Sequence, residues 1–392
     1  MSLSQTIVAH LLNNAMSLAE IQETTRASLP TVRRAVAALN EAQWVRVVGQ
    51  AEANGGRPAM LFGLDELHFM ILGLQLQLPG IRLIAADLKG HVLKQGDYFT
   101  GEIPSPNLAI RTIVDAIGQF QAAFPEREAL GLGIASPGFI DAETGDIVAI
   151  GRVPTWVNFP ICRHLREATG LPLQIANDVD CMAIAEFSHD NEPSQNNQVY
   201  IGFCEGLKAS LFLQGELFTG SLGNVGLISS DLLNLPAEGD HSDTRRLMTT
   251  LGFMKVFKQR IERLNFRDQE DYQAILDLDD RDARFHLILQ KAITDEKICG
   301  PLVQDLIKII SVALANIIHL IQPDEIIIGG LLTELPDPLF LELEALTRGL
   351  IPPLISHNLI FKRGNLISPN KAALGAVYNF LFNHLEDLLA EI

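Results

Sequence analysis

The chain has 392 residues, of which 47% are hydrophobic and 20% are charged. This composition allows a large buried core, and the length corresponds to roughly two to three domains. The formal net charge of −17 excludes a uniform attraction to nucleic acid. The charge is unevenly distributed, because residues 1–63 contain five Arg and four Glu and sum to +1, whereas the remainder sums to −18. We therefore expect only the N-terminal part to approach phosphate.

The cysteine spacing and the apolar segments indicate an intracellular protein. No two cysteines lie within two residues of one another, so there is no CxC or CxxC metal pair, and we expect reduced, buried thiols. The chain does not open with a secretory signal. Its most apolar segments, residues 69–78 and 326–332, are shorter than the roughly 20 residues of a membrane helix. We expect a cytoplasmic protein without membrane insertion.

Residues 1–64 show the pattern of a winged helix-turn-helix domain. Apolar side chains at helical spacing predict a first helix over residues 4–13. Ser17 with Glu20 three residues later forms a capping box for a second helix. Ser28 is placed to cap a third helix, and Pro30 is tolerated in its first turn. Residues 44–48 read as a strand that pairs with residues 61–62, and the Gly-Gly pair between them permits a turn with positive φ.

The third helix carries the residues predicted to contact DNA. Apolar positions at helical spacing would be buried, which leaves Thr31, Arg33, Arg34 and Ala37 outside, where helix-turn-helix proteins read base edges. An arginine there suits a bidentate contact to guanine or a phosphate contact. Arginine in the wing suits a minor groove or a phosphate. The predicted DNA-binding residues are Ser28, Thr31, Arg33, Arg34 and Arg57. The alternative is a small three-helix domain that makes protein contacts through solvated arginines.

From residue 69 onward the pattern changes to a repeated α/β layout. Three strands, a helix and a further strand are followed by three more strands, a long helical region and a buried strand. Such a duplication predicts two similar α/β lobes with a ligand cleft between them. The expected strands are residues 71–78, 81–87, 91–94 and 129–134 in the first half and 199–203, 209–213, 216–219 and 324–328 in the second. The expected helices include residues 107–124, 179–187 and 301–321.

Several short motifs in a fixed order resemble the ROK family, which joins repressors, open reading frames and sugar kinases. The resemblance covers nearly the whole chain and is greatest to the branch of sugar-responsive repressors with a winged helix fused to a sugar-kinase-like body. Each motif alone is weak, but their order and spacing together are specific. The motifs are Gly55-Gly56-Arg57-Pro58, residues 81–90, residues 131–138, Asn177-Asp178, residues 223–226, residues 323–330 and residues 372–376.

The resemblance implies the two-lobed actin-like, ribonuclease-H-like ATPase and sugar-kinase fold behind an N-terminal winged helix-turn-helix domain. It implies a DNA-binding domain over residues 1–64, a first lobe over 69–185 and a second lobe over 186–371, with the C-terminal helix 372–392 packing back on the first lobe. In family kinases an Asp of the Asn-Asp pair is the general base. The positions that match the sugar contacts are Gly138, Asn158, Asn177, Asp178 and Gly226. For the Asn-Asp pair, capping of the helix after it is the alternative.

The chain departs from the family at the positions that serve phosphoryl transfer. The family's Asp-x-Gly-Gly-Thr reads Gln75-Leu-Gln-Leu-Pro79 here, without the acid, both glycines and the hydroxyl. The second phosphate loop carries Glu205, whose carboxylate repels a triphosphate. The Gly-Glu-x-Gly-His motif is altered after Gly226, and no cysteine lies between residues 231 and 254, where His241 stands alone. We expect no phosphoryl transfer, no zinc and no cofactor.

The sequence thus predicts a non-enzymatic sugar-responsive transcriptional regulator, a repressor that binds double-stranded operator DNA as a homodimer or higher homo-oligomer. A sugar or sugar phosphate between the lobes would be the effector. One alternative is a ROK-type sugar kinase with an accessory DNA-binding domain. Another is a sensor that a sugar-transporter protein sequesters.

Overall fold

The computed structural model describes residues 2–51, 58–77, 80–99, 104–150, 153–188, 196–228, 246–365, 368–390 and 392. The chain divides into two compact units, which are described separately. Unit 1 comprises Met1–Pro193 and Ser368–Ile392, and unit 2 comprises Ser194–Ile367. His241 and the tip of the predicted wing, including Arg57, lie outside the described residues.

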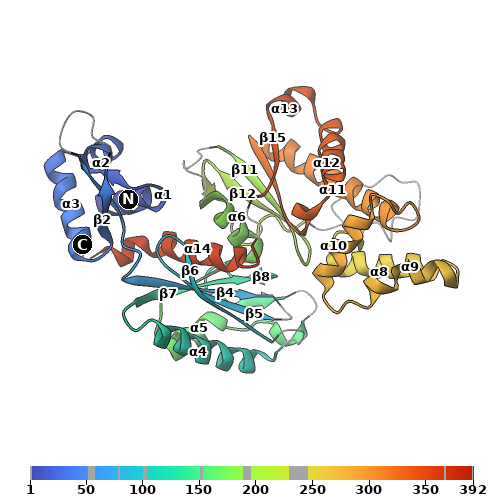
Figure 1. The fold of residues 1–392 in the computed structure, drawn as a ribbon, viewed down its shortest axis with the longest axis horizontal. Coiled ribbons are helices and arrows are strands. Elements are labelled where there is room, and N and C mark those ends of the chain that lie inside the picture. Colours follow the sequence, from blue (N-terminus) through green and yellow to red (C-terminus); the bar gives the residue numbers. More distant parts are fainter. Residues whose placement is uncertain are drawn as a thin grey trace. The chain divides into compact units, whose positions relative to one another are not determined.

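The N-terminal head, residues 1–64, has three helices and a small sheet of order β1-β3-β2 (Figure 1). Its strands β2 and β3 form the predicted antiparallel pair, with a register shift between Val47 and Gly49. The sequence pattern did not reveal β1, a two-residue strand that pairs with β3. The elements are α1 (Leu3–Asn13), β1 (Met16–Ser17), α2 (Leu18–Thr25), α3 (Leu29–Glu41), β2 (Val45–Gln50) and β3 (Met60–Leu64).

Local capping chemistry defines where the head's helices begin. The Ser17 side chain accepts from the backbone N–H of Glu20, and the Glu20 carboxylate accepts from that of Ser17, so the predicted capping box is confirmed. These hydrogen bonds lower the pKa of Glu20, first through the Ser17 backbone N–H. Ser28 caps α3 and Pro30 lies in its first turn, as predicted. The chain reverses between α2 and α3 at Arg26, which has a left-handed backbone with φ 56°.

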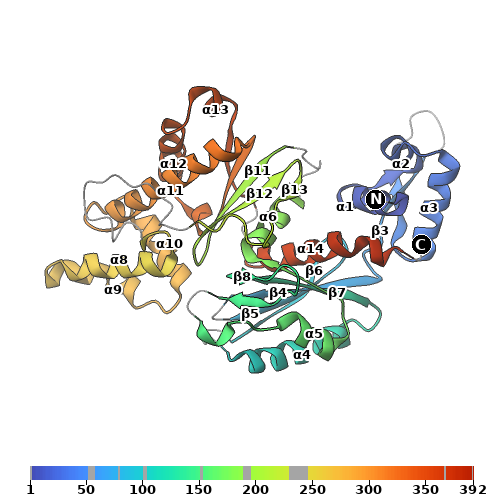
Figure 2. The same cartoon turned by 180° about the vertical axis from the view of Figure 1, so that it is seen from behind.

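Behind the head, unit 1 contains a five-stranded sheet of order β10-β7-β4-β5-β6, in which β5 and β6 are antiparallel and β7 and β10 are parallel to their neighbours. Helices α4 and α5 cover one face, and α14 and α6 lie on the other (Figures 1 and 2). The strands are β4 (Phe69–Leu76), β5 (Ile81–Ala86), β6 (Val92–Tyr98), β7 (Glu128–Ser136), β8 (Phe139–Ile140), β9 (Ile147–Ala149) and β10 (Leu173–Asn177). The helices are α4 (Pro106–Ala123), η1 (Pro154–Trp156), α5 (Ile161–Thr169), α6 (Asp178–Ser188) and α14 (Lys371–Leu388).

Unit 2 repeats this topology with a five-stranded sheet of order β13-β12-β11-β14-β15. Both sheets run through a three-strand meander and two parallel strands in the same chain order, which confirms the predicted duplication. The strands are β11 (Gln198–Phe203), β12 (Leu207–Leu213), β13 (Glu216–Leu217), β14 (Glu325–Gly330) and β15 (Ile360–Arg363). The helices are α8 (Thr250–Glu262), α9 (Phe266–Leu276), α10 (Arg281–Lys291), α11 (Cys299–Ile321), η3 (Leu331–Glu334), α12 (Asp337–Gly349) and α13 (Pro353–Asn358).

Helix α11 was not recognised as an exceptionally apolar segment in the sequence. It has 23 residues and is long and apolar enough to cross a membrane by length and composition, and 61% of its most apolar window is buried in the protein. Leu302, Leu306, Ile310 and Leu314 are buried in the main hydrophobic cluster of unit 2. This burial is that of the central core helix of a folded unit.

Glycines bring α14 unusually close to the sheet of unit 1. A Cβ on Gly133 would lie 1.9 Å from the carbonyl oxygen of Ala376, and one on Gly73 would lie 2.3 Å from that of Ala373. On its other side, α14 meets α6 at Gly375, where a Cβ would lie 1.7 Å from the Cys181 carbonyl oxygen. The C-terminal helix therefore packs on the first sheet. The finer boundaries at residues 64, 69, 185 and 371 remain predictions, since the compact units divide elsewhere.

Candidate nucleic-acid interface and effector site

Helix α3 separates a buried apolar stripe from an exposed basic face. Val32, Val36 and Leu39 are buried, as their helical spacing predicted. On the opposite face Arg33 and Arg34 are exposed, in the second turn of the helix. A guanidinium group can contact a phosphate or the edge of a guanine, so this exposed face of α3 suits a contact with DNA.

Ser28 and Thr31, the two hydroxyl-bearing residues of the predicted interface, form hydrogen bonds with each other at the start of α3. The Ser28 hydroxyl accepts from the backbone N–H of Thr31 at 3.4 Å, and the two hydroxyl oxygens lie 2.7 Å apart. Ser28 is exposed and Thr31 is half-buried. The pair fixes the start of α3, and a DNA contact by either residue remains a prediction. Arg57, with the Gly-Gly turn before it, lies outside the described residues.

The hairpin formed by β2 and β3 exposes apolar side chains that the sequence analysis did not single out. Val47 is 45% exposed and Met60 is 53% exposed. In the sequence, the only sign of these residues was the weak alternation of apolar and polar residues over residues 44–48. This alternation did not show which face of the hairpin is exposed to solvent. The exposed side chains flank the strands that lead to the predicted wing.

Three of the five predicted effector residues come together where β7 and β10 end. Asn177 is buried, and its Nδ2 donates to the Gly138 carbonyl at 3.2 Å. Its Oδ1 accepts from the backbone N–H of Val179 at 3.0 Å, and Asp178 Oδ1 accepts from the same group at 2.9 Å. The alternative role as a helix cap is thus present in the structure. Asp178 is only half-buried, so its carboxylate can also serve a ligand.

Asn158 borders the same hairpin as Gly138. Its backbone N–H donates to the Val148 carbonyl at 3.1 Å, its φ is 50°, and its side chain is exposed. Gly138 has φ 83°, and a Cβ there would lie 2.2 Å from the Ala149 carbonyl, so the backbone itself requires glycine. Both residues therefore flank β9. This placement supports a shared role for Gly138 and Asn158, although the role itself stays a prediction.

Gly226, the fifth predicted effector residue, belongs to unit 2. Its φ is 84°, and its carbonyl accepts from the backbone N–H of Ala209 at 2.8 Å. A Cβ would lie 1.7 Å from the Ala209 carbonyl. Close backbone packing against β12 accounts for a glycine here, and a contact with an effector remains a prediction.

Gln75 and Glu205 lie at the positions predicted to correspond to the two phosphate loops. Gln75 is 7% exposed, and its Oε1 has no hydrogen-bond partner among the described residues; Leu78 and Pro79 lie outside them. The Glu205 carboxylate accepts hydrogen bonds from both terminal nitrogens of the Arg281 guanidinium, a pairing that the sequence could not reveal. The loop at Glu205 therefore presents an occupied carboxylate.

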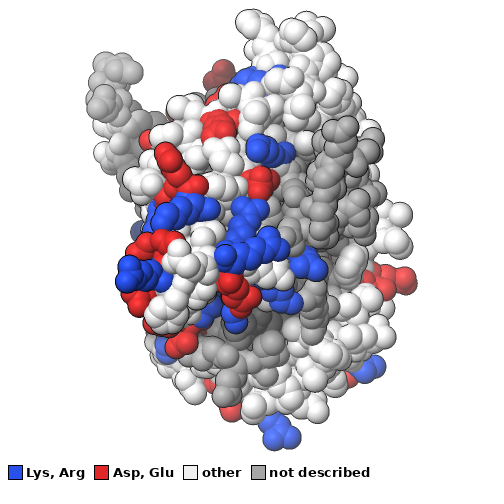
Figure 3. Space-filling model, turned by 90° about the vertical axis from the view of Figure 1, so that its right-hand side faces the viewer, with Lys and Arg blue, Asp and Glu red and all other residues white. Residues whose placement is uncertain are grey.

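On the face of the protein seen in Figure 3, basic side chains stand among acidic ones. Ion pairs of unit 2 include Arg260 with Asp305 at 2.6 Å and Lys297 with Asp268 at 2.7 Å. Such mixed charge does not form the single-sign field that attracts a polyanion.

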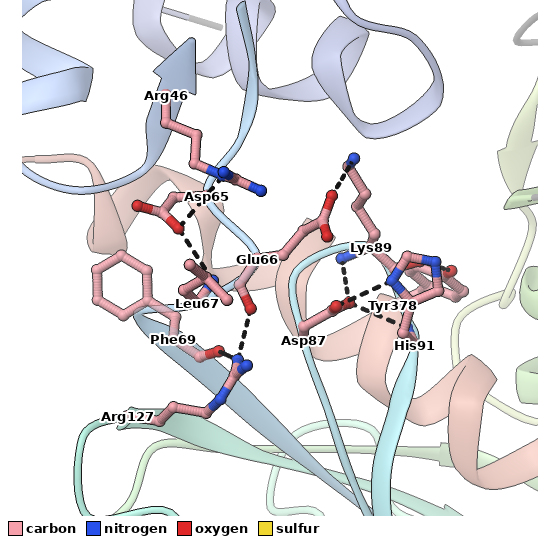
Figure 4. A network of polar contacts seen from close by, with 10 residues as sticks. All are labelled: Arg46, Asp65, Glu66, Leu67, Phe69, Asp87, Lys89, His91, Arg127 and Tyr378. Atoms are coloured by element: carbon pink, nitrogen blue, oxygen red, sulfur yellow. Dashed lines mark hydrogen bonds and ion pairs between the residues drawn. The ribbon is translucent and has the colours of Figure 1, made fainter. Parts of the chain in front are cut away.

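Among the described residues, one group of side chains could hold a metal ion (Figure 4). Ligand atoms of Glu66, Asp87 and His91 lie within 4.8 Å of one another. The ammonium of Lys89 already donates to the Glu66 carboxylate, and His91 Nδ1 lies 2.9 Å from Asp87 Oδ2. The carboxylates thus have cationic and N–H partners within the protein.

The fold and these residues define a class of protein in which a winged helix-turn-helix head is followed along the chain by a duplicated α/β body of the sugar-kinase type. The sequence model of the ROK family matches residues 72–234 of this chain. The chain is 23% identical over 363 residues to the "DNA-binding transcriptional dual regulator NagC" of Escherichia coli (strain K12), covering 92% of this chain and 87% of that protein.

Two solved structures share the fold. A ROK family transcriptional regulator, a homolog of the E. coli MLC protein, matches with a TM-score of 0.73 and 19% identity over 97% of this chain and 98% of its own. The ROK hexokinase of Thermus thermophilus matches with a TM-score of 0.61 and 19% identity over 81% of this chain and all of its own. The regulator thus matches a larger share of this chain than the enzyme does.

Proposed function

We propose that the chain is a sugar-responsive transcriptional regulator, a repressor that binds operator DNA through α3 and the wing. The exposed Arg33–Arg34 pair on the outer face of α3 carries this proposal. It supplies the positive charge that the rest of the acidic chain lacks. Relatives named as regulators over most of the chain support the same conclusion.

Substitution of Arg34 tests the interface. Duplexes selected from a random pool by binding to the protein would supply the operator. Arg34→Ala should weaken binding to the selected duplex about 5- to 150-fold, which corresponds to roughly 1–3 kcal/mol for a base contact. If Arg34 contacts phosphate instead, the slope of log affinity against log salt should fall by about 0.9. Arg111→Ala on α4, which also removes an exposed charge but away from the head, is the matched control. Unchanged affinity and salt dependence in Arg34→Ala would refute the docking.

We further propose that a sugar or sugar phosphate binds at the group formed by Gly138, Asn158, Asn177 and Asp178. The half-buried Asp178 carboxylate and the nearby amides supply directional hydrogen bonds of the kind that sugar hydroxyls require. A thermal-shift screen against sugars and sugar phosphates should find a ligand that raises the melting temperature. Asp178→Asn should abolish this shift and leave operator binding intact, whereas Asp115→Asn on α4 should change neither. A full ligand response in Asp178→Asn would remove this residue from the site.

The chain is proposed to lack kinase activity. Gln75 replaces an acid at the end of β4, and the Arg281–Glu205 pair fills the second loop position. A coupled assay with ATP and common hexoses and aminosugars should show no turnover. Phosphorylation above background would favour the alternative, a ROK-type sugar kinase with an accessory DNA-binding domain.

The remaining proposals concern assembly and location. We place the regulator in the cytoplasm as a homodimer or higher homo-oligomer, because two heads related by a twofold axis match a palindromic operator. A sugar-transporter protein is an alternative partner for release from DNA. Pull-downs from cells grown on different sugars would test this alternative.

A further inference from the structure

The connection between the head and the first sheet is only four residues long, Asp65–His68, and polar contacts hold it on both sides (Figure 4). We call this segment the linker. On the head side, the Asp65 backbone N–H donates to the Trp44 carbonyl at 2.8 Å, and Asp65 pairs with Arg46 at 3.8 Å. The rings of Trp44 and Phe69 lie 5.0 Å apart. The contacts of Asp65 join the linker to the head, and the ring contact joins the head to β4.

On the body side, the linker is held by charged groups from two loops. The Arg127 guanidinium donates to the carbonyls of Glu66 at 2.5 Å and Phe69 at 3.2 Å. The ammonium of Lys89, in the turn between β5 and β6, donates to the Glu66 carboxylate. These are charge-assisted hydrogen bonds, which are stronger than neutral ones.

The turn that presents Lys89 is itself fixed. The Asp87 carboxylate accepts from the backbone N–H groups of Lys89 at 2.9 Å and His91 at 3.0 Å. From α14, the Tyr378 hydroxyl donates to the Lys89 carbonyl at 2.9 Å. Burial raises the pKa of Tyr378 to about 12, so the hydroxyl keeps its proton for this bond. Lys89 is therefore held in place by both its own turn and α14.

Glu66 lies between positive groups of the head and of the body. Its pKa is lowered chiefly by the hydrogen bond from Lys89, against an opposing effect of burial, and further by the charges of Lys89, Arg46 and His91. Arg46 belongs to β2 of the head, whereas Lys89 and His91 belong to the β5–β6 turn. The Glu66 carboxylate thus pairs with Lys89 of the body and is also stabilised by the charge of Arg46 of the head.

We propose that Glu66 and Lys89 are positioning residues that set the orientation of the DNA-binding head on the body. This inference rests on the proposed function, because it assumes that the head binds operator DNA. α14 contacts both the β5–β6 turn through Tyr378 and α6 through a buried ion pair of Lys371 with Glu186. α6 starts at Asp178, the proposed effector residue, so two helices, α14 and α6, connect the positioning pair to the effector site.

Charge exchange across the pair tests the proposal. Glu66→Lys and Lys89→Glu should each lower affinity for a two-half-site operator about tenfold and flatten its dependence on half-site spacing. The double variant Glu66→Lys/Lys89→Glu should recover affinity to within about threefold of the wild type, because it restores the pair in reverse. Glu66→Gln, which keeps a hydrogen-bond acceptor without the charge, is a milder variant that tests the same pair if the charge-reversed variants misfold. Glu167→Lys on α5 is the control for a change of net charge.

Hydrogen exchange without DNA provides an independent readout. The amides of Asp65 and Leu67 should exchange faster in both single variants and regain protection in the double variant. Wild-type affinity in Glu66→Lys, or a double variant no better than the singles in both assays, would overturn the positioning role. If the selection with the wild type yields no bound duplex but the exchange pattern is as expected, the proposed function is refuted and the pair is kept.

Discussion

Replacement of Gly375 by alanine should destabilise unit 1 although alanine is the better helix former. Gly375 lies within α14, where it faces the backbone of α6, and a Cβ would lie 1.7 Å from the Cys181 carbonyl oxygen. A relaxed carbon–oxygen contact needs about 3.3 Å, so the two helices must separate by roughly 1.6 Å. The obstacle is a backbone atom, which cannot rotate away as a side chain could.

The magnitude follows from two opposing effects. Overpacking of this kind costs about 3 kcal/mol, the upper end of its usual range. Alanine in place of glycine inside a helix contributes about 1 kcal/mol of stability. We therefore expect a net loss of about 2 kcal/mol. For a unit of this size, that loss lowers the melting temperature by roughly 4–8 °C.

Tryptophan fluorescence can follow this transition selectively. The chain has two tryptophans, and both Trp44 and Trp156 are buried in unit 1. Gly118→Ala is the matched control, because Gly118 also lies within a helix of unit 1 but a Cβ there meets nothing within 4 Å. Gly118→Ala should raise the midpoint by roughly 1–4 °C, from about 0.5–1 kcal/mol. If Gly375→Ala shifts the midpoint in the same direction as Gly118→Ala, the close packing of α14 on α6 is wrong.

Three further predictions concern the head, the linker and the cysteines. Ser17→Ala should destabilise the head by about 1 kcal/mol through loss of the capping box, measured by chemical denaturation. The pKa of Glu66 in the folded protein is below its ordinary value of 4.5, so its ionised carboxylate contributes fully to stability above pH 4.5, and this contribution is lost as the pH falls through the folded pKa. Glu66→Gln should therefore make the free energy of unfolding less dependent on pH in the acid range. An unchanged pH dependence would contradict the pairing with Lys89. Cys204 is half-buried, whereas the other three cysteines are buried, and burial raises the pKa of the Cys162 thiol to about 11. Cys204 should therefore react fastest with a disulfide reagent in the native protein. Rapid reaction of a second thiol would argue against the packing around the buried cysteines.

Features that depend on neighbouring residues in the chain were predictable from the sequence. The capping box at Ser17 and Glu20 and the cap at Ser28 follow from hydrogen bonds over three residues, so residue types at fixed spacing were sufficient. The duplicated meander was predictable because alternating apolar runs and short turns mark each strand. The resulting strand order is the same in both units.

Features that join distant residues were not predictable from one sequence. Glu205 and Arg281 are 76 positions apart, and Glu66 and Lys89 are 23 positions apart, so no local pattern pairs them. At the candidate effector site, Asn177 and Asp178 could be selected by resemblance, but the bond from Asn177 to the Gly138 carbonyl required the fold. The helix over residues 301–321 was predicted, but the exceptional apolarity of α11 was not noticed because its polar residues interrupt the run of hydrophobic letters, whereas folding buries its apolar side.

The glycine motifs of this chain have a packing role that does not depend on phosphate. Gly73 and Gly133 admit the backbone of α14, and Gly131 leaves room for the Phe380 ring, where a Cβ would lie 2.1 Å from it. Any larger residue at these positions would push the C-terminal helix off the sheet. Gln75, two residues after Gly73 in the same strand, is also buried, and its Oε1 has no hydrogen-bond partner among the described residues. These glycines are therefore needed to hold α14 on the sheet of unit 1, whether or not the chain binds phosphate.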